Sequence, residues 1–262
     1  MNSADGIRVM SFNLRADTPN DGINRFFNRS SRVIETIHRE APGLIGFQEA
    51  KNEMRAFLRE RLPQYVVLGC GRNSAYDGEG ILIAYREDQF ELIEFQTRWL
   101  SDTPELPGSR FDSDQSKYPR VYVYAKLRRF ADNKTVAFVN THTDHVGQKA
   151  RVSASIQLLK TMHAMQADGL VLTGDFNALP NSEEIQMLTA DTELGLTDVS
   201  AAIPFSFHNF GRCVPWKCDY IFSTCPSSEC HVIEDIPVNG VYISDHNPIV
   251  ATIFMNKEDL RS

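Results

Sequence analysis

The chain has 262 residues, 42% of them hydrophobic, and it carries a formal net charge of -7. No stretch approaches the roughly 18 to 20 apolar residues of a membrane span, so no membrane-spanning segment is expected. The acidic balance disfavours long-range attraction to bulk nucleic acid. Because no change in composition marks a linker, we expect a single domain over residues 1–262.

Apolar runs rich in β-branched and aromatic residues predict strands along the whole chain. These runs cover residues 8–12, 44–47, 65–69, 81–85, 90–95, 121–127, 135–140, 170–172, 219–222 and 248–254. Helical spacing of apolar residues predicts helices over 30–40 and 148–165, and a shorter helix that starts at residue 181 or 182. Hairpin-like strand pairs alternate with strand, helix, strand units, so a purely parallel sheet is not expected.

The five cysteines include no C-x-x-C pair, and the first residues lack the apolar run of a secretory signal. Both features favour a reduced, cytoplasmic protein, and nothing in the sequence suggests an obligate protein partner. Four of the cysteines precede His231, at positions 213, 218, 225 and 230. Their spacing matches no common zinc knuckle, so a zinc site is not expected there.

Polar side chains follow the first two predicted strands. Asn13 and Arg15 come after the strand at 8–12, and Glu49 comes after the strand at 44–47. An amide and a guanidinium together could hold the oxygen shell of a cation and a phosphate. Taken alone, Asn13 is more typical of a turn cap, and Glu49 is more typical of a solvated loop carboxylate.

Two histidines and a carboxylate follow the strand at 135–140. Strand alternation places His142 on the face that carries Asn140 and Asp144, with His145 on the opposite face. A histidine at a strand end is commonly a hydrogen-bonded structural group, but the concentration of titratable side chains here equally favours a functional site.

The segment Gly174-Asp175-Phe176-Asn177 follows another buried strand. A carboxylate that orients water, beside an amide that donates to a phosphoryl oxygen, is what hydrolysis at phosphorus needs. An Asx turn leading into the following helix is the alternative for this motif.

The last motif is Ser244-Asp245-His246-Asn247-Pro248. Asp245 could bind a metal ion directly or through water, and His246 could act as a base or contact phosphate. Asp219, at the head of its predicted strand, is a candidate to fix the tautomer of His246.

In their order, these motifs resemble the endonuclease/exonuclease/phosphatase superfamily, which has the deoxyribonuclease I-like fold. The resemblance spans nearly the whole chain. It implies an α/β (α+β) four-layer sandwich, in which two packed, mostly antiparallel sheets are flanked by helices. The segments Trp99–Pro104 and Pro119-Arg120 further resemble a bacterial subgroup whose substrates are mostly unassigned.

The resemblance also implies a divalent cation, Mg²⁺ or Mn²⁺, and hard oxygen ligands suit both ions on independent grounds. By position, Glu49 would be the main metal ligand, with Asn13 and Asp245 near the metal or its waters. These residues are expected to make the protein a metal-dependent phosphoesterase, either a phosphodiesterase or a phosphatase.

The same resemblance implies roles in catalysis for five further residues. Asp175 would orient the attacking water, and Asn177 and His142 would contact phosphoryl oxygens. His246, paired with Asp219, would serve as a base or as an electrostatic stabiliser.

The substrate is expected to be a small phosphoester. His142 stands where many nucleases of the superfamily place a tyrosine, which resembles the deadenylase, sphingomyelinase and tyrosyl-DNA phosphodiesterase branches. The substrate-binding candidates are Arg15, Arg120, Arg151 and Asp144, and surface ion pairs are the alternative for each arginine. A nuclease acting on DNA or RNA and a catalytically dead phosphate-binding protein are the alternative functions.

Overall fold

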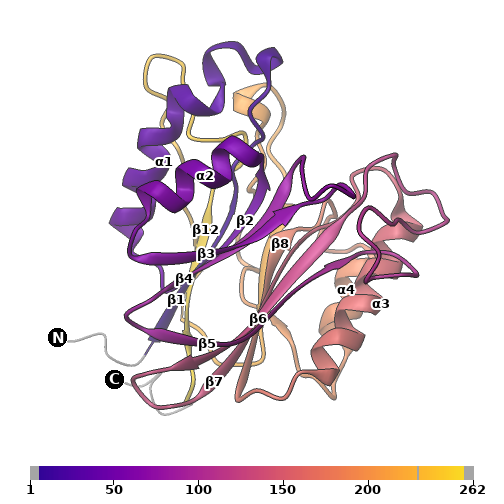
Figure 1. The fold of residues 1–262 in the computed structure, drawn as a ribbon. Coiled ribbons are helices and arrows are strands. Elements are labelled where there is room, and N and C mark those ends of the chain that lie inside the picture. Colours follow the sequence, from indigo (N-terminus) through magenta and orange to yellow (C-terminus); the bar gives the residue numbers. More distant parts are fainter. Residues whose placement is uncertain (1–5, 229, 257–262) are drawn as a thin grey trace.

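The computed structural model describes residues 6–228 and 230–256. Two six-stranded sheets pack face to face, and helices cover the outer face of each sheet (Figure 1). The expected four-layer α/β arrangement is therefore confirmed.

The first sheet has the strand order β11-β12-β1-β2-β4-β3. Only β1 and β2 pair in parallel within it; the other pairs are antiparallel. Its strands are β1 (Gly6–Asn13), β2 (Leu44–Ala50), β3 (Tyr65–Gly71), β4 (Gly80–Arg86), β11 (His231–Val232) and β12 (Ile249–Phe254).

The second sheet has the order β5-β6-β7-β8-β10-β9, and only β7 and β8 pair in parallel. Its strands are β5 (Phe90–Trp99), β6 (Val121–Arg129), β7 (Thr135–His142), β8 (Gly169–Asp175), β9 (Thr197–Asp198) and β10 (Asp219–Ser223). Both sheets are thus mixed and mostly antiparallel, as expected.

Two helices cover each sheet on its outer side (Figure 1). Helices α1 (Phe26–Glu40) and α2 (Asn52–Arg61) share an apolar core with the first sheet. Helices α3 (Gln148–Ala164) and α4 (Glu183–Ala190) do the same with the second sheet. A third core fills the space between the sheets. None of the described helices is both long and apolar enough to cross a lipid bilayer.

The predicted strands are all present, but some helical turns were not predicted. Helix α1 begins at Phe26 rather than residue 30, and α2 was missed entirely. Within α2, the buried residues Met54 and Leu58 lie one turn apart, and most of their neighbours are charged. The periodic spacing of apolar residues that predicts a helix is therefore limited to a single turn. Strand β3 continues to Gly71, two residues beyond the predicted strand at 65–69.

A buried amide network joins the two sheets close to one end of the sandwich. Asn140 Nδ2 on β7 donates to the Phe47 carbonyl at 2.9 Å and to the Leu82 carbonyl at 2.8 Å in the other sheet. Asn140 Oδ1 accepts hydrogen bonds from Gln48 Nε2 at 2.7 Å and from Thr173 Oγ1 at 3.0 Å. The network fixes how the two sheets face each other at this end.

Strand register brings the polar motifs to this same end. In the first sheet, Asn13 lies opposite Gln48, and Gln48 directly precedes Glu49. In the second sheet, Asp175 lies between His142 on one side and Asp219 on the other. Residues far apart in the sequence therefore meet where the two sheets abut.

Candidate active site

The centre of the site is the Asp175 carboxylate at the end of β8. Its Oδ2 atom accepts a hydrogen bond from Asn13 Nδ2 at 2.9 Å, and it lies 3.5 Å from His142 Nε2 and 3.8 Å from His246 Nε2. Its Oδ1 atom accepts from the backbone N–H of Asn177 at 2.9 Å. That bond is the Asx turn considered as an alternative, so the turn itself holds the carboxylate in place.

Glu49 reaches this centre from the first sheet through a distorted backbone. The β2–β4 register shifts between Phe47 and Ala50, and Glu49 has a φ of 64°. A bulge re-aims side chains, and a positive φ is strained in a residue with a Cβ atom. Glu49 accepts hydrogen bonds from Asn13 Nδ2 at 3.1 Å and from the Ala16 backbone N–H at 2.9 Å. Asn13 therefore bridges the Glu49 and Asp175 carboxylates.

His246 is oriented by a buried carboxylate. Its Nδ1 atom lies 2.8 Å from Asp219 Oδ2, and its ring packs edge-on against Phe207. Burial lowers the pKa of His246, but Asp219, Asp175 and Asp245 outweigh burial and raise it to about 10. His246 is therefore an imidazolium at neutral pH, with Nε2–H directed toward Asp175.

The carboxylates at the centre are crowded and shielded from water. Burial, together with the charge of Asp219, raises the pKa of Asp175 to about 7, and burial also raises the pKa of Asp245. Burial would raise the pKa of Glu49 too, but Arg15 and the hydrogen bond from Ala16 lower it overall. So much negative charge in one buried place calls for a compensating cation.

The donor set fits a divalent metal ion. Ligand atoms of Glu49, His142 and Asp175 all lie within 4.8 Å of one another. Burial and the neighbouring charge of Arg120 keep the pKa of His142 well below its usual value, so the imidazole is neutral and able to ligate. The two carboxylates suit Mg²⁺ or Mn²⁺, whereas an imidazole ligand is more typical of transition metals such as Zn²⁺. Asn13 presents its NH₂ group to both carboxylates, while its Oδ1 accepts from the Arg15 backbone N–H.

Above these residues lies a cleft with a volume of about 360 Å³. The predicted residues that line it are Arg15, Glu49, Arg120, His142, Asp175, Asn177, Asp245 and His246. Sequence reasoning did not assign to the site its other lining residues, which are Arg72, Glu79, Tyr118, His145, Phe207, Asn209, Trp216 and Cys218. Arg72 directly follows the apolar strand β3, the same signal that identified Glu49 and Asp175.

Two of the substrate-binding candidates lie outside the cleft lining. Arg151 Nε contacts the buried Glu184 at 2.5 Å and so links α3 to α4. Asp144 lies behind Arg120, with its Oδ2 atom 3.5 Å from Arg120 Nε. Arg15 does line the cleft, but its guanidinium is held by Asp21 at 2.9 Å and lies 3.7 Å from Asp245. Each of the three arginines therefore forms or approaches an ion pair with a carboxylate, which was the alternative to substrate binding.

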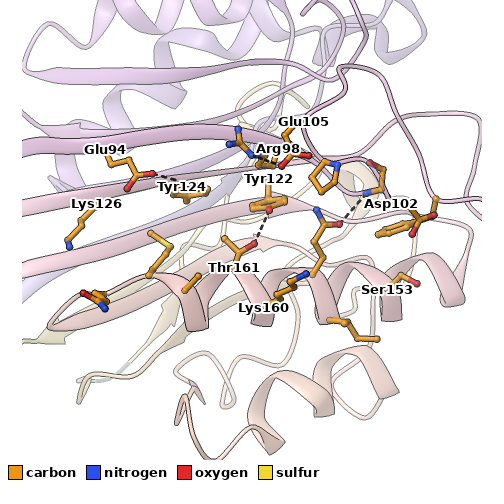
Figure 2. Close-up of a pocket in the computed structure, with 18 residues that line it drawn as sticks. Glu94, Arg98, Asp102, Glu105, Tyr122, Tyr124, Lys126, Ser153, Lys160 and Thr161 are labelled. Carbon is orange, nitrogen blue, oxygen red and sulfur yellow. Dashed lines mark hydrogen bonds and ion pairs between the residues drawn. The ribbon is translucent and has the colours of Figure 1, made fainter.

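A larger hollow, of about 890 Å³, lies on the outer side of the second sheet between β5, β6 and α3 (Figure 2). We call it the outer groove. Tyr122 on β6 is 2.9 Å from Thr161 on α3, and Arg98 pairs with Glu105 at 3.7 Å (Figure 2). Lys160 lies next to Thr161 on α3, whereas Lys126 lies farther along the groove, near Glu94 and Tyr124 (Figure 2). The groove contains none of the candidate catalytic, metal-binding or substrate-binding residues, although Ser101, Asp102 and Pro104 of the segment Trp99–Pro104 line it.

Comparisons with known proteins identify the family of the chain. The family model described as the Endonuclease/Exonuclease/phosphatase family matches residues 10–246. An endonuclease/exonuclease/phosphatase from Bacteroides vulgatus is 30% identical, with a TM-score of 0.89, and the match covers 96% of this chain and 99% of that one.

Two further solved structures are similar over nearly the whole chain. A mannosyl-6-phosphatase from Bacteroides thetaiotaomicron is 25% identical, with a TM-score of 0.84 and coverage of 95% of this chain and 100% of that one. The human Nocturnin catalytic domain, solved with a bound sulfate anion, is 18% identical, with a TM-score of 0.71 and coverage of 94% and 93%. At that identity the likeness to Nocturnin concerns the fold alone.

Proposed function

The chain belongs to the endonuclease/exonuclease/phosphatase family, and we propose that it is a divalent-metal-dependent hydrolase of a compact phosphate ester. The observation that carries this proposal is the convergence of Glu49, His142 and Asp175 within 4.8 Å, at the base of a cleft. Glu49 and Asp175 would hold Mg²⁺ or Mn²⁺, with His142 and Asp245 beside them. A bound divalent ion would neutralise charge on the phosphoryl group and on the leaving oxygen.

The residues around Asp175 suit proton removal from an attacking water. In its deprotonated form Asp175 accepts a proton from the water while the new P–O bond forms and the ester P–O bond breaks. Asn13 holds this carboxylate in place through the bond to Oδ2, and the Asn177 backbone holds Oδ1. The alcohol that leaves takes its proton from solvent water.

His246 and Asn177 would stabilise the phosphoryl group as charge develops on it. The buried contact with Asp219 keeps His246 charged and fixes its Nδ1–H, so its Nε2–H faces the reaction centre. Both His246 and Asn177 line the cleft. Donors held in advance at such a position are a large part of catalysis in many hydrolases. The charged state of His246 favours the role of stabiliser over that of base.

A compact substrate suits the cleft better than a duplex. Its volume of about 360 Å³ lies near the lower end for small-molecule sites, which run from roughly 300 to 1,000 Å³. The net charge of -7 also opposes binding to a polyanion. The likeness to a mannosyl-6-phosphatase supports including hexose phosphates among the substrates tested.

The test is hydrolysis of sugar phosphates, nucleotides, phospholipid headgroups and short oligonucleotides by the purified chain, before and after chelation. Activity is expected to vanish with chelator and to return with Mg²⁺ or Mn²⁺. Glu49→Gln should lower kcat/KM by at least about a hundred-fold, because it removes a charged metal ligand. Glu94→Gln, on the exposed face of β5, is the matched control and should leave kcat/KM unchanged. Full turnover after exhaustive chelation would contradict the proposal.

A further inference from the structure

Two buried arginines lie on one flank of the cleft and have no place in the reaction described above. Arg72 follows β3 and Arg120 precedes β6, and the two side chains are only 8% and 5% exposed. Both line the cleft, and both also line a small cavity beside His142. Burying two guanidinium groups away from water carries a large desolvation free energy unless negatively charged groups lie next to them.

The carboxylates nearby compensate this charge only in part. Arg72 Nη1 pairs with Glu79 Oε2 at 2.5 Å, and Asp144 Oδ2 lies 3.5 Å from Arg120 Nε. The Arg120 Nε–H group is buried and lacks a hydrogen-bond partner among the described residues. Burial, reinforced by the charge of Arg120, lowers the pKa of Arg72 even though Glu79 opposes the shift. An anion between the two arginines would relieve their repulsion and accept the unused N–H.

His145 supplies a third donor at the same place. Arg120 Nη2 lies 2.8 Å from His145 Nδ1, and because a guanidinium can only donate, Nδ1 is the acceptor and Nε2 carries the proton. The Tyr118 ring closes this flank, with Arg72 Cζ 4.5 Å from the ring centroid. The donors that converge here match the oxygens of a phosphate or carboxylate.

The flank borders the centre where the ester would react, but its arginines have carboxylate partners of their own. Among the described residues, Arg72 and Arg120 form no ion pair with Glu49, Asp175 or Asp245; their carboxylate partners are Glu79 and Asp144. Arg15, by contrast, lies 3.7 Å from Asp245. The arginines of the flank are thus not used to balance the carboxylates of the centre, which leaves them available to an anion other than the phosphoryl group beside Asp175.

We propose that Arg72, Arg120 and His145 form a second anion subsite, so that the substrate is a compact phosphoester carrying a further phosphate or carboxylate group. The subsite holds that second oxyanion while the ester phosphate lies at the Asp175 centre. This inference rests on the proposed function for its kinetics, but binding of an anion to the flank can be measured without turnover.

The binding experiment is calorimetric titration of the full chain with inorganic phosphate in the presence of EDTA. Arg72→Gln and Arg120→Gln should each weaken phosphate binding by about ten-fold, the loss of one charge-assisted contact. Arg128→Gln is the matched control, because Arg128 pairs with the exposed Glu91, and it should bind as the wild type does. Equal phosphate binding by the wild type and both cleft variants, or none by the wild type, would overturn the subsite.

The kinetic experiment compares substrate pairs that differ by one anionic group: glucose monophosphate with glucose bisphosphate, and glycerol phosphate with phosphoglycerate. The wild type should prefer the more anionic member of a pair by about ten-fold in kcat/KM, and Arg72→Gln should abolish the preference by lowering kcat/KM about ten-fold more on that member than on the other. The pair that shows the preference identifies phosphate or carboxylate as the group bound.

Losses of equal size on both members of each pair would show that the arginines hold the ester phosphate itself, which contradicts the proposal. Turnover of no substrate in any pair would count against the proposed function, while the calorimetry would still decide the subsite. Arg72→Lys keeps the charge beside Glu79 and replaces Arg72→Gln if the latter lowers the melting temperature. Because lysine lacks the planar, forked set of N–H donors of arginine, Arg72→Lys should still remove most of the preference.

Discussion

The cleft and the outer groove are two hollows of the described structure that differ in kind. The groove is larger, about 890 Å³ against about 360 Å³, yet its charged side chains are exposed or half-buried and its ion pair is long, 3.7 Å between Arg98 and Glu105. In the cleft, Asp175 and His246 are buried and tightly held. Burial of charge, which water would otherwise oppose, therefore locates the chemistry better than the size of a hollow does.

The largest effects that can test this comparison are expected at the Asp219–His246 pair. Asp219→Asn and His246→Ala should each lower kcat by about 10²- to 10⁴-fold, because both remove an oriented imidazolium. The double variant should be little worse than the worse single variant, since the two residues act as one unit. Additive losses in kcat would show that they act separately.

A spectroscopic measurement accompanies this cycle and does not depend on turnover. Asp219 contributes to raising the pKa of His246 to about 10, so Asp219→Asn should lower that pKa. Imidazole nitrogen shifts followed by NMR as a function of pH would measure the change. An unaltered His246 titration in Asp219→Asn would contradict the electrostatic role of the pair.

A smaller effect, on stability, is expected from Asp144 on the flank of the cleft. Burial alone would raise its pKa, but hydrogen bonds from the Gly147 and Val146 backbone and from Ser116 lower it to about 2. Since the folded value lies below the unfolded one, Asp144 stabilises the fold fully above about pH 4 and loses this contribution as the pH falls toward 2. The unfolding free energy of Asp144→Asn should therefore lie about 2 kcal/mol below that of the wild type at pH 6.

Denaturant titrations at several pH values would measure this difference, which should shrink to nothing near pH 2. The matched control is Asp102→Asn at the outer groove, where the aspartate is exposed. A gap between wild type and Asp144→Asn that stays constant from pH 6 to pH 2 would show that packing, and not the carboxylate charge, is responsible.

The smallest effect is expected in the outer groove itself. Lys160 is exposed there, so Lys160→Ala should change the unfolding free energy by less than about 0.5 kcal/mol. Its kcat/KM on the best substrate should match that of the wild type. A loss of activity comparable with that of Glu49→Gln would break the distinction between the two hollows.

The strands and most of the central residues could be predicted because each motif directly follows an apolar run. Asn13 and Asp175 end their strands, Glu49 is the last residue but one of β2, and the two parallel pairs carry these strand ends to one edge. The length of each apolar run indicates where its strand ends. The polar side chains at these strand ends are therefore expected to lie close together at one edge of the sheets. Helix α2 was missed because two buried residues among many charges give a weak periodic signal.

Of the flank of the cleft, only Arg120 was predicted as a substrate-binding residue, because loops determine the rest. Arg72 and Glu79 lie on either side of the β3–β4 turn, and Tyr118 and Arg120 end the long connection before β6. No periodicity relates residues on separate loops. Arg151 shows the converse: its sequence position near the motifs suggested a substrate contact, while the buried Glu184 on α4 takes its guanidinium.

The amide network around Asn140 has a consequence for how the protein folds. Gln48, Asn140 and Thr173 of this network precede cleft residues on the same strands by one or two positions. Three of its four hydrogen bonds join the two sheets, and the fourth joins Asn140 to Thr173 in the same sheet. A chain in which each sheet has formed but the two have not yet docked would have all its strands and no cleft. During refolding, recovery of catalysis should accordingly lag behind the far-ultraviolet signal of the strands and coincide with the near-ultraviolet signal of packed aromatic rings.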